Sequence, residues 1–325
     1  MNELRIFVDF ALPPDALEML KDGCKHRRLI FASAPATSVL ASVEHDPQLM
    51  NADVAFGQPD LKSIETAGNL KWVHVSSSSI TRYDNQAFRD LVAQRGIAVS
   101  NSASVYNEAC AEHAFSFMLA QSRSLPVSLM TRTPGGSETW RSLRSSCVSL
   151  RGQSVLILGY GAIGRGLVEL LAPFEMNIIA YRRKARGDEG APVITELELE
   201  SVLRSGVDHV MNILPDSERT RHFFDTHRFS VMKPGAVFYN IGRGATVDQD
   251  ALLAALRSGR IRAAWLDVTT PEPLPDEHPL WAEPNCHITP HVAGGHAGEA
   301  KTLVRHFLKN LQRFVRGEPL LNRVM

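Results

Sequence analysis

The chain has 325 residues, 44% of them hydrophobic, which is enough for about two domains with cores of their own. Lys plus Arg and Asp plus Glu are equal at 35 each, and this balance argues against nucleic acid or an anionic membrane surface as a partner. The four cysteines are scattered, the first apolar run contains charges, and no apolar run approaches ~20 residues, so we expect a soluble cytoplasmic protein without signal peptide or membrane helix.

The first hundred residues alternate short apolar runs with helical patterns, which is typical of a small α/β domain with a parallel sheet. Four serines at 76–79 directly follow one predicted strand, where ligands of open α/β sheets bind and where backbone N–H groups can hold a carboxylate. Taken alone, the same stretch also fits an ordinary polar turn. Strands are predicted at 4–8, 54–56, 70–75 and 97–99, and helices at 13–20 and 60–67.

The middle of the chain predicts a connection between two domains. Residues 108–124 are apolar on most sides and indicate a buried connecting helix. Residues 131–152, with Pro134, Gly135, Gly136 and several Ser and Arg, predict a loop-rich excursion.

A glycine motif, GYGAIG, lies between predicted strands at 155–158 and 177–181 and opens a helical pattern. In this context Gly159 allows a tight turn, Gly161 lets the backbone approach a pyrophosphate, and Gly164 lets the helix pack on the strand. The helix N-terminus offers free N–H groups to the phosphates. The motif therefore predicts a dinucleotide site, although a glycine turn in an ordinary βαβ unit has the same outline.

The end of the second strand bears on which dinucleotide is bound. A fold that binds NAD places Asp or Glu there to accept from the ribose 2′-OH. This chain has Arg182, followed by Arg183 and Lys184. A guanidinium can pair with a 2′-phosphate in a bidentate manner, so we expect NADP in preference to NAD, with NAD still possible. A solvated basic loop is the alternative interpretation.

After this corner the βα alternation continues and predicts a doubly wound sheet of six strands. The last helix carries an apolar face, and we expect it to return to the first domain. The expected domains are a discontinuous substrate domain at 1–100 and 297–325 and a dinucleotide domain at 101–296. The remaining elements are strands at 207–214, 236–241 and 262–268 and helices at 229–233, 249–258 and 299–316, with Leu303, Val304, Phe307, Leu311, Phe314 and Val315 on the last helix's apolar face.

Three polar residues, Arg243, Glu272 and His291, follow predicted strands in the second half. Each alone has an unremarkable interpretation as a surface cation, a loop acid or a turn residue, but together they form a plausible site. Reduction of a 2-oxo acid needs a proton donor such as histidine, a carboxylate that holds the imidazole, and a cation for the substrate carboxylate. A zinc site at His287 and His291 is disfavoured because Pro290 breaks the helix that such a pair requires.

With these motifs in hand, the chain resembles the D-isomer-specific 2-hydroxyacid dehydrogenases over nearly its full length, and within them the glyoxylate and hydroxypyruvate reductase branch. The resemblance implies a Rossmann domain and a smaller flavodoxin-like substrate domain, both doubly wound parallel α/β sheets. It rests on GYGAIG at 159–164, LPDSERTR at 214–221, NIGRGATVD at 240–248, WLDVTTPEPLP at 265–275, and HPLW at 278–281 with ITPH at 288–291.

The resemblance also implies the roles of individual residues. Catalysis falls on Arg243, Glu272 and His291, contact with the nicotinamide amide on Asp267, and the turn that grips the substrate carboxylate on Ser78 and Ser79. Substrate binding adds Arg243 and His291, and no metal is expected. The implied cofactor-binding set is Gly159, Gly161, Ala162, Ile163, Gly164, Arg182, Arg183, Leu214, Pro215, Ile241, Asp267 and His291.

Two departures from the family pattern affect these expectations. The family often has Ala-Gly or Val-Gly where this chain has Ser78-Ser79, and the usual ribose aspartate is Arg182. We expect hydride transfer from NADPH to glyoxylate or hydroxypyruvate, giving the D-2-hydroxy acid where the product is chiral. We also expect a homodimer that uses residues 120–150. D-lactate-type oxo acids, formate, phosphite or a non-catalytic dinucleotide sensor stay open as alternatives.

Overall fold

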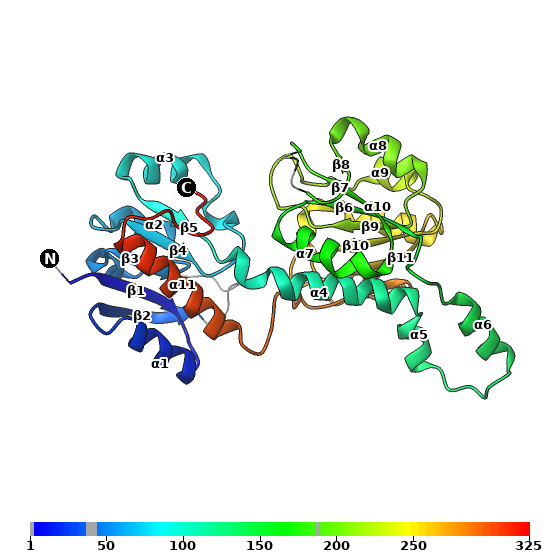
Figure 1. Ribbon diagram of the computed structural model, residues 1–325, viewed down its shortest axis with the longest axis horizontal. Helices are drawn as coiled ribbons and strands as arrows, with labels where there is room; N and C mark the ends of the chain where they lie inside the picture. The colour runs from blue at the N-terminus through cyan, green and yellow to red at the C-terminus, as the bar shows by residue number, and fades with distance from the viewer. Residues whose placement is uncertain (1–2, 37–43, 186, 188) are drawn as a thin grey trace. The chain divides into compact units, whose positions relative to one another are not determined.

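The computed structural model describes residues 3–36, 44–185, 187 and 189–325. The chain divides into two compact units, unit 1 with Met1–Tyr106 and His296–Met325, and unit 2 with Asn107–Gly295 (Figure 1). The first boundary falls six residues after the expected position, because the helix that begins at Ala103 starts within unit 1.

Unit 1 is a five-stranded parallel sheet in the order β2-β1-β3-β4-β5. This is the flavodoxin-like order, as predicted. Its strands are β1 (Arg5–Phe10), β2 (Arg28–Ala36), β3 (Val54–Gly57), β4 (Trp72–Val75) and β5 (Ala98–Ser100), and its helices include α1 (Pro14–Gly23), α2 (Leu61–Thr66) and α3 (Gln86–Arg95). The sequence analysis missed β2 and α3; β2 has no clean alternation, since it is an edge strand with mostly exposed or half-buried residues.

The C-terminal helix α11 (Glu299–Val315) belongs to unit 1, where it packs against α1. Phe307 is fully buried and stacks on Phe56 and Trp72, with ring centroids 4.1 and 5.4 Å apart. The expected apolar face extends one residue too far at its C-terminal end, because Val315 in the last turn of α11 is 57% exposed.

Unit 2 is a seven-stranded parallel sheet in the order β12-β11-β10-β9-β6-β7-β8. The order reverses at β6, which has β9 on one side and β7 on the other, and this is the Rossmann arrangement with its ligand crevice at the reversal. The predicted fold class is therefore confirmed, with one strand more than expected. The strands are β6 (Ser154–Leu158), β7 (Asn177–Tyr181), β8 (Val193–Ile194), β9 (His209–Asn212), β10 (Ala236–Asn240), β11 (Ile261–Leu266) and β12 (Cys286–Ile288).

The excursion expected as loop-rich at 131–152 contains a helix, α6 (Glu138–Ser146). Ser137 caps this helix by accepting from the Trp140 backbone N–H at 3.0 Å. The helix was not predicted because the segment is rich in Ser and Arg, a composition that also fits a loop. The other helices of this half are α4 (Ala103–Ser122), α5 (Leu125–Met130), α7 (Ala162–Leu171), α8 (Glu196–Ser205), α9 (Thr226–Val231) and α10 (Gln249–Arg257). Among the described residues, no helix is long and apolar enough to cross a membrane.

Candidate active site

The site of unit 2 is built on the carboxyl ends of its parallel strands, which meet at one edge of the sheet. The glycine turn follows β6, Arg182 follows β7, Leu214 follows β9, Arg243 follows β10, Asp267 follows β11 and His291 follows β12. Strands far apart in the sequence thus bring the predicted residues of this unit to the same edge.

The glycine turn has the shape that a dinucleotide needs. Gly159 has φ +98°, and a Cβ there would lie 2.5 Å from the Ile213 carbonyl oxygen. A Cβ on Gly164 would lie 3.0 Å from the Gly159 carbonyl oxygen, whereas one on Gly161 would meet nothing within 4 Å. The open side at Gly161, next to the first turn of α7 with Ala162 and Ile163, fits a pyrophosphate group.

The turn that carries Arg243 is fixed by buried polar side chains. Asn240 donates to the Arg243 carbonyl oxygen at 3.1 Å, and the Thr246 hydroxyl donates to the same oxygen at 2.6 Å. A Cβ on Gly244 would lie 1.9 Å from the Thr269 carbonyl oxygen, so only glycine lets this turn approach the loop that carries Glu272. The Arg243 guanidinium donates to the Gly242 carbonyl oxygen at 2.6 Å.

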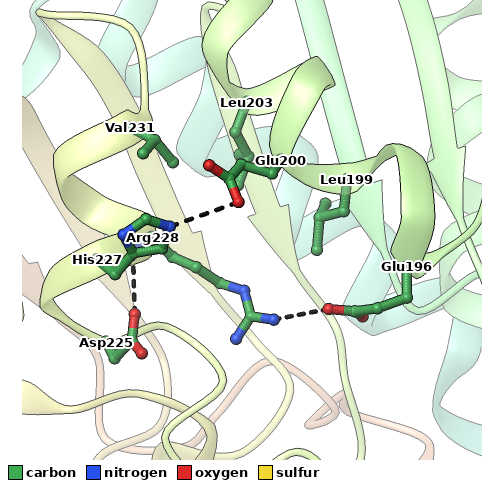
Figure 2. A pocket seen from close by; sticks show the side chains of 8 residues that line it. All are labelled: Glu196, Leu199, Glu200, Leu203, Asp225, His227, Arg228 and Val231. Atoms are coloured by element: carbon green, nitrogen blue, oxygen red, sulfur yellow. Dashed lines mark hydrogen bonds and ion pairs between the residues drawn. The ribbon is translucent and has the colours of Figure 1, made fainter.

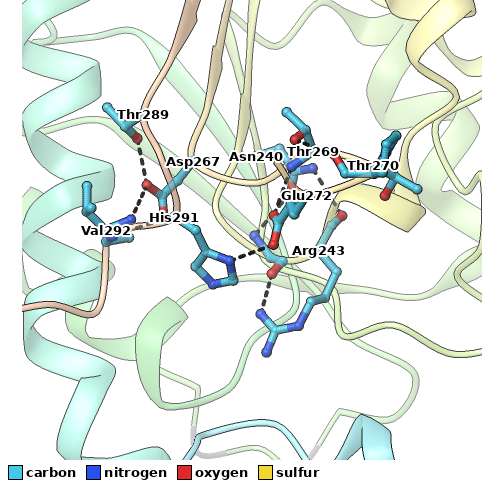
Figure 3. Close-up of polar contacts among 12 residues, drawn as sticks. Asn240, Arg243, Asp267, Thr269, Thr270, Glu272, Thr289, His291 and Val292 are labelled. Carbon is cyan, nitrogen blue, oxygen red and sulfur yellow. Dashed lines mark hydrogen bonds and ion pairs between the residues drawn. The ribbon is translucent and has the colours of Figure 1, made fainter. Parts of the chain in front are cut away.

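His291 and Glu272 form a hydrogen-bonded pair beside this turn, with His291 Nδ1 2.8 Å from Glu272 Oε2 (Figure 3). Both side chains are 29% exposed, so the pair is open to a ligand. The second carboxylate oxygen of Glu272 accepts from the Thr269 backbone N–H at 3.0 Å, which fixes its orientation. Because Nδ1 is hydrogen-bonded to the carboxylate, a ligand would have to use Nε2 of this ring.

Burial and neighbouring charges shift the pKa values of several side chains at this edge. Burial opposes ionisation of Glu272, but the hydrogen bond and charge of His291, the Thr269 N–H and the Arg243 charge outweigh burial and lower the pKa of that carboxyl. Burial also lowers the pKa of Arg243, which nevertheless stays a cation because its ordinary value is so high. Burial and the Asp267 charge raise the pKa of the Cys110 thiol to about 12, so this α4 side chain is neutral.

Asp267 is 2% exposed and holds the loop that carries His291. Its carboxylate accepts from the Thr289 hydroxyl at 2.6 Å and from the backbone N–H groups of Val292 and Ala293 at 2.9 Å each (Figure 3). The Asp267 carbonyl oxygen accepts from the His291 N–H at 2.9 Å, where His291 adopts φ +52°.

His113 was not predicted from the sequence, and its Nε2 lies 3.3 Å from the Thr289 hydroxyl and 3.6 Å from Asp267 Oδ1. Burial lowers the pKa of His113, and the negative charge of Asp267, which would raise this pKa, offsets only part of the effect. The sequence did place a histidine inside an apolar helix, and this could have indicated a polar partner, because a buried imidazole needs one.

Other members of the predicted cofactor set lie along the same edge. Leu214 and Ile241 are buried at 5% exposure each, and Pro215 is exposed. Arg183 is exposed, but Arg182 is paired: its Nη1 lies 2.7 Å from Glu189 Oε1.

Ser78 and Ser79 follow β4 in unit 1. The Ser77 hydroxyl donates to the Ser79 carbonyl oxygen at 2.6 Å, and Asn101 donates to the Ser78 carbonyl oxygen at 2.8 Å. Neither serine has a positive φ, so the turn forms here without the glycine that the family often has.

A pocket of unit 2 lies between α8 and α9 (Figure 2). Arg228 pairs with Glu196 at 2.7 Å there, and His227 lies 3.5 Å from Glu200. Asp225 caps α9 by accepting from the Arg228 backbone N–H at 2.9 Å. The Arg, Glu and His residues of this pocket lie on the two helices, whereas those of the candidate site follow the strands of the sheet.

Fold and site together define the class of nicotinamide-dependent dehydrogenases built on a Rossmann sheet. The family profile "D-isomer specific 2-hydroxyacid dehydrogenase, NAD binding domain" matches residues 115–293, more than half of the chain. The chain belongs to this family of D-2-hydroxyacid dehydrogenases, and it is an NAD(P)-dependent dehydrogenase or reductase.

Individual relatives agree with this assignment. The chain is 35% identical over 263 residues to the human glyoxylate reductase/hydroxypyruvate reductase, covering 80% of this chain and 79% of the human protein. It is 35% identical over 326 residues to a glyoxylate reductase of Aeropyrum pernix, covering 98% and 95%. The structure of an NADPH-dependent glyoxylate/hydroxypyruvate reductase from Sinorhizobium meliloti with NADP and malonate superposes with a TM-score of 0.75 at 26% identity, covering 99% and 97%.

Proposed function

We propose that this chain reduces small 2-oxo acids with NADPH, acting on glyoxylate and hydroxypyruvate in preference to bulkier oxo acids. The observation that carries the proposal is the 2.8 Å His291–Glu272 pair beside the Arg243 turn, on the same sheet edge as the glycine turn. The names of the human, Aeropyrum and Sinorhizobium relatives support the substrate class.

Each of the three residues has a physical role in the proposed reaction. Arg243 binds the substrate carboxylate and polarises the carbonyl group. The His291 imidazolium gives its Nε2 proton to the carbonyl oxygen, and Glu272 orients the ring and stabilises its charged form. A dinucleotide held by the glycine turn would supply the hydride for the carbonyl carbon. Glyoxylate then yields glycolate, and hydroxypyruvate yields D-glycerate.

The remaining predicted residues complete the proposal. Gly159 to Gly164 would hold the pyrophosphate, and Leu214, Pro215, Ile241 and Asp267 would line the rest of the cofactor site. Arg182 and Arg183 would favour the 2′-phosphate of NADPH. In unit 1, the Ser78–Ser79 turn would bind the substrate carboxylate through its backbone N–H groups.

We also propose that the protein is a cytoplasmic homodimer. Its four free cysteines fit a reducing compartment. The helix α5 exposes Leu129 and Met130 by 79% and 87%, and a second copy would cover these side chains.

A substrate panel tests the proposed function. Glyoxylate, hydroxypyruvate, pyruvate, phenylpyruvate and, in the oxidative direction, formate and phosphite are assayed for kcat/KM with both NADPH/NADP and NADH/NAD. We expect glyoxylate and hydroxypyruvate with NADPH to give the highest values. Higher values for a bulky oxo acid or for phosphite would contradict the substrate class. Tight dinucleotide binding without turnover of any substrate would favour the sensor instead.

A further inference from the structure

The corner that follows β7 holds a carboxylate as well as cations. Glu189 Oε1 lies 2.7 Å from Arg182 Nη1, and the two side chains are 3% and 14% exposed. The other carboxylate oxygen of Glu189 accepts from the Gly187 N–H at 2.8 Å. The guanidinium of Arg182 is therefore matched by an anion of its own chain.

Glu189 is also tied to the glycine turn. Its backbone carbonyl oxygen accepts from the hydroxyl of Tyr160, which lies between Gly159 and Gly161. One residue thus connects the two parts of the site that border the adenosine end, the glycine turn and the end of β7. By contrast, Arg183 and Lys184 of the same corner are exposed.

We propose that Glu189 is a specificity-determining residue that reduces the preference for NADPH by competing with the 2′-phosphate for the Arg182 guanidinium. The inference rests on the proposed role of Arg182 in binding that phosphate. To bind the phosphate, a guanidinium that is already paired must first lose its contact with the carboxylate. Otherwise it must bind the carboxylate and the phosphate together, and these two anions repel each other. NADH carries an uncharged hydroxyl at this position, so the competition leaves its binding unchanged.

The size of the effect follows from the strength of the displaced contact. A hydrogen bond between charged groups is strong, and burial protects this pair from much of the screening by salt. Replacing Glu189 with Gln keeps an oxygen that can accept from Gly187 but removes the charge. We expect this variant to bind a 2′-phosphate roughly ten-fold more tightly.

The experiment uses two probes that differ only in that group, adenosine 2′,5′-bisphosphate and adenosine 5′-monophosphate. Their dissociation constants are measured calorimetrically at fixed ionic strength for the full chain and for Glu189→Gln, Arg182→Ala and the double variant. Glu200→Gln is the matched control, because Glu200 pairs with Arg204 at 2.6 Å on exposed α8 and its loss changes the net charge equally. Melting temperatures verify folding, and Glu189→Asp, with a shorter reach, replaces the Gln variant if that variant does not fold.

The expected result is a roughly ten-fold gain for the bisphosphate in Glu189→Gln, no change for the monophosphate, and no gain when Arg182 is also replaced. An unchanged or weaker bisphosphate affinity in Glu189→Gln overturns the inference. If Arg182→Ala nevertheless weakens bisphosphate binding, the NADPH preference stands and only the inference fails. If Arg182→Ala changes neither probe's affinity, the proposed role of Arg182 fails, and the inference fails with it.

Discussion

Two parts of the same sheet edge are held by different kinds of contact. At the catalytic edge, the loops after β10, β11 and β12 are held by buried side chains: Asn240 and Thr246 fix the Arg243 turn, and Asp267 fixes the His291 loop. At the ribose corner after β7, the contacts include the Arg182–Glu189 ion pair, a Gly187 N–H and a Tyr160 hydroxyl that donate to Glu189, and the Arg182 N–H, which donates to the Ile194 carbonyl oxygen at 3.2 Å.

The difference corresponds to two kinds of task. Proton transfer needs donor and acceptor atoms within hydrogen-bond reach, so its side chains gain from a rigid frame. Cofactor preference depends on the balance of charge near one phosphate, which a single side chain can change without altering the frame. Substitutions at the catalytic edge should therefore affect turnover, and those at the ribose corner should affect the choice of cofactor.

The largest expected effect is at the catalytic edge. His291→Ala removes the proposed proton donor, and we expect kcat for oxo acid reduction to fall by roughly 10²–10⁴-fold. The dissociation constant for NADPH, measured by fluorescence titration, should change little. His227→Ala, which removes an exposed histidine from the pocket between α8 and α9, is the control and should keep full activity (Figure 2). Turnover close to wild type in His291→Ala would exclude this residue as the donor.

The ribose corner offers the complementary test. Arg182→Asp places a carboxylate where a 2′-OH can donate and a 2′-phosphate is repelled, and it also breaks the pair with Glu189. We expect the NADPH-to-NADH ratio of kcat/KM to fall by roughly ten- to several-hundred-fold. Solvent exposure and screening by salt reduce the size of this change. The ratio is measured at fixed ionic strength. A wild type that prefers NADH, or a ratio unmoved by the substitution, would refute the interpretation of Arg182.

The contrast also explains what the sequence could predict. Arg243, Glu272 and His291 each follow a strand within a distinctive motif, and the common edge of a parallel sheet brings them together. Likewise, the order of elements predicted both sheets, except for strands such as β2 and β8 that are short or lack a clear pattern.

Contacts that depend on loop conformation could not be predicted in this way. Glu189 lies seven residues after Arg182, and neither spacing nor composition indicates that the segment folds back to pair them. His113 reaches Thr289 across 176 residues, through the packing of α4. Such partners become visible only when the packing is known, because no local pattern encodes them.

A third prediction tests whether the catalytic edge is as rigid as its contacts indicate. In Gly244→Ala the new Cβ would lie 1.9 Å from the Thr269 carbonyl oxygen, so the Arg243 and Glu272 loops must separate. We expect a stability loss of about 1–3 kcal/mol in denaturant unfolding, together with a roughly ten-fold loss of kcat/KM. Gly135→Ala is the matched control, since a Cβ there meets nothing within 4 Å. Equal stability and activity in both variants would show that this edge adapts easily.

The smallest effect concerns the pH profile of the catalytic edge. The pKa of Glu272 is lowered because its His291 hydrogen bond, the Thr269 N–H and nearby positive charges outweigh burial, so its carboxylate is ionised throughout the neutral range. An ionised Glu272 accepts the hydrogen bond that orients the His291 ring, and this contact should be lost only on the acid side, once the pH falls through the lowered pKa of Glu272. Glu272→Gln removes the carboxylate charge at every pH. We expect kcat/KM at neutral pH to fall by roughly two- to five-fold, a small change because the pair is partly exposed, and the acid limb of the profile to flatten. Glu277→Gln, which changes an exposed acid of the same loop, should leave both the rate and the limb unchanged. An acid limb with its wild-type position and depth in Glu272→Gln would mean that titration of Glu272 does not set it.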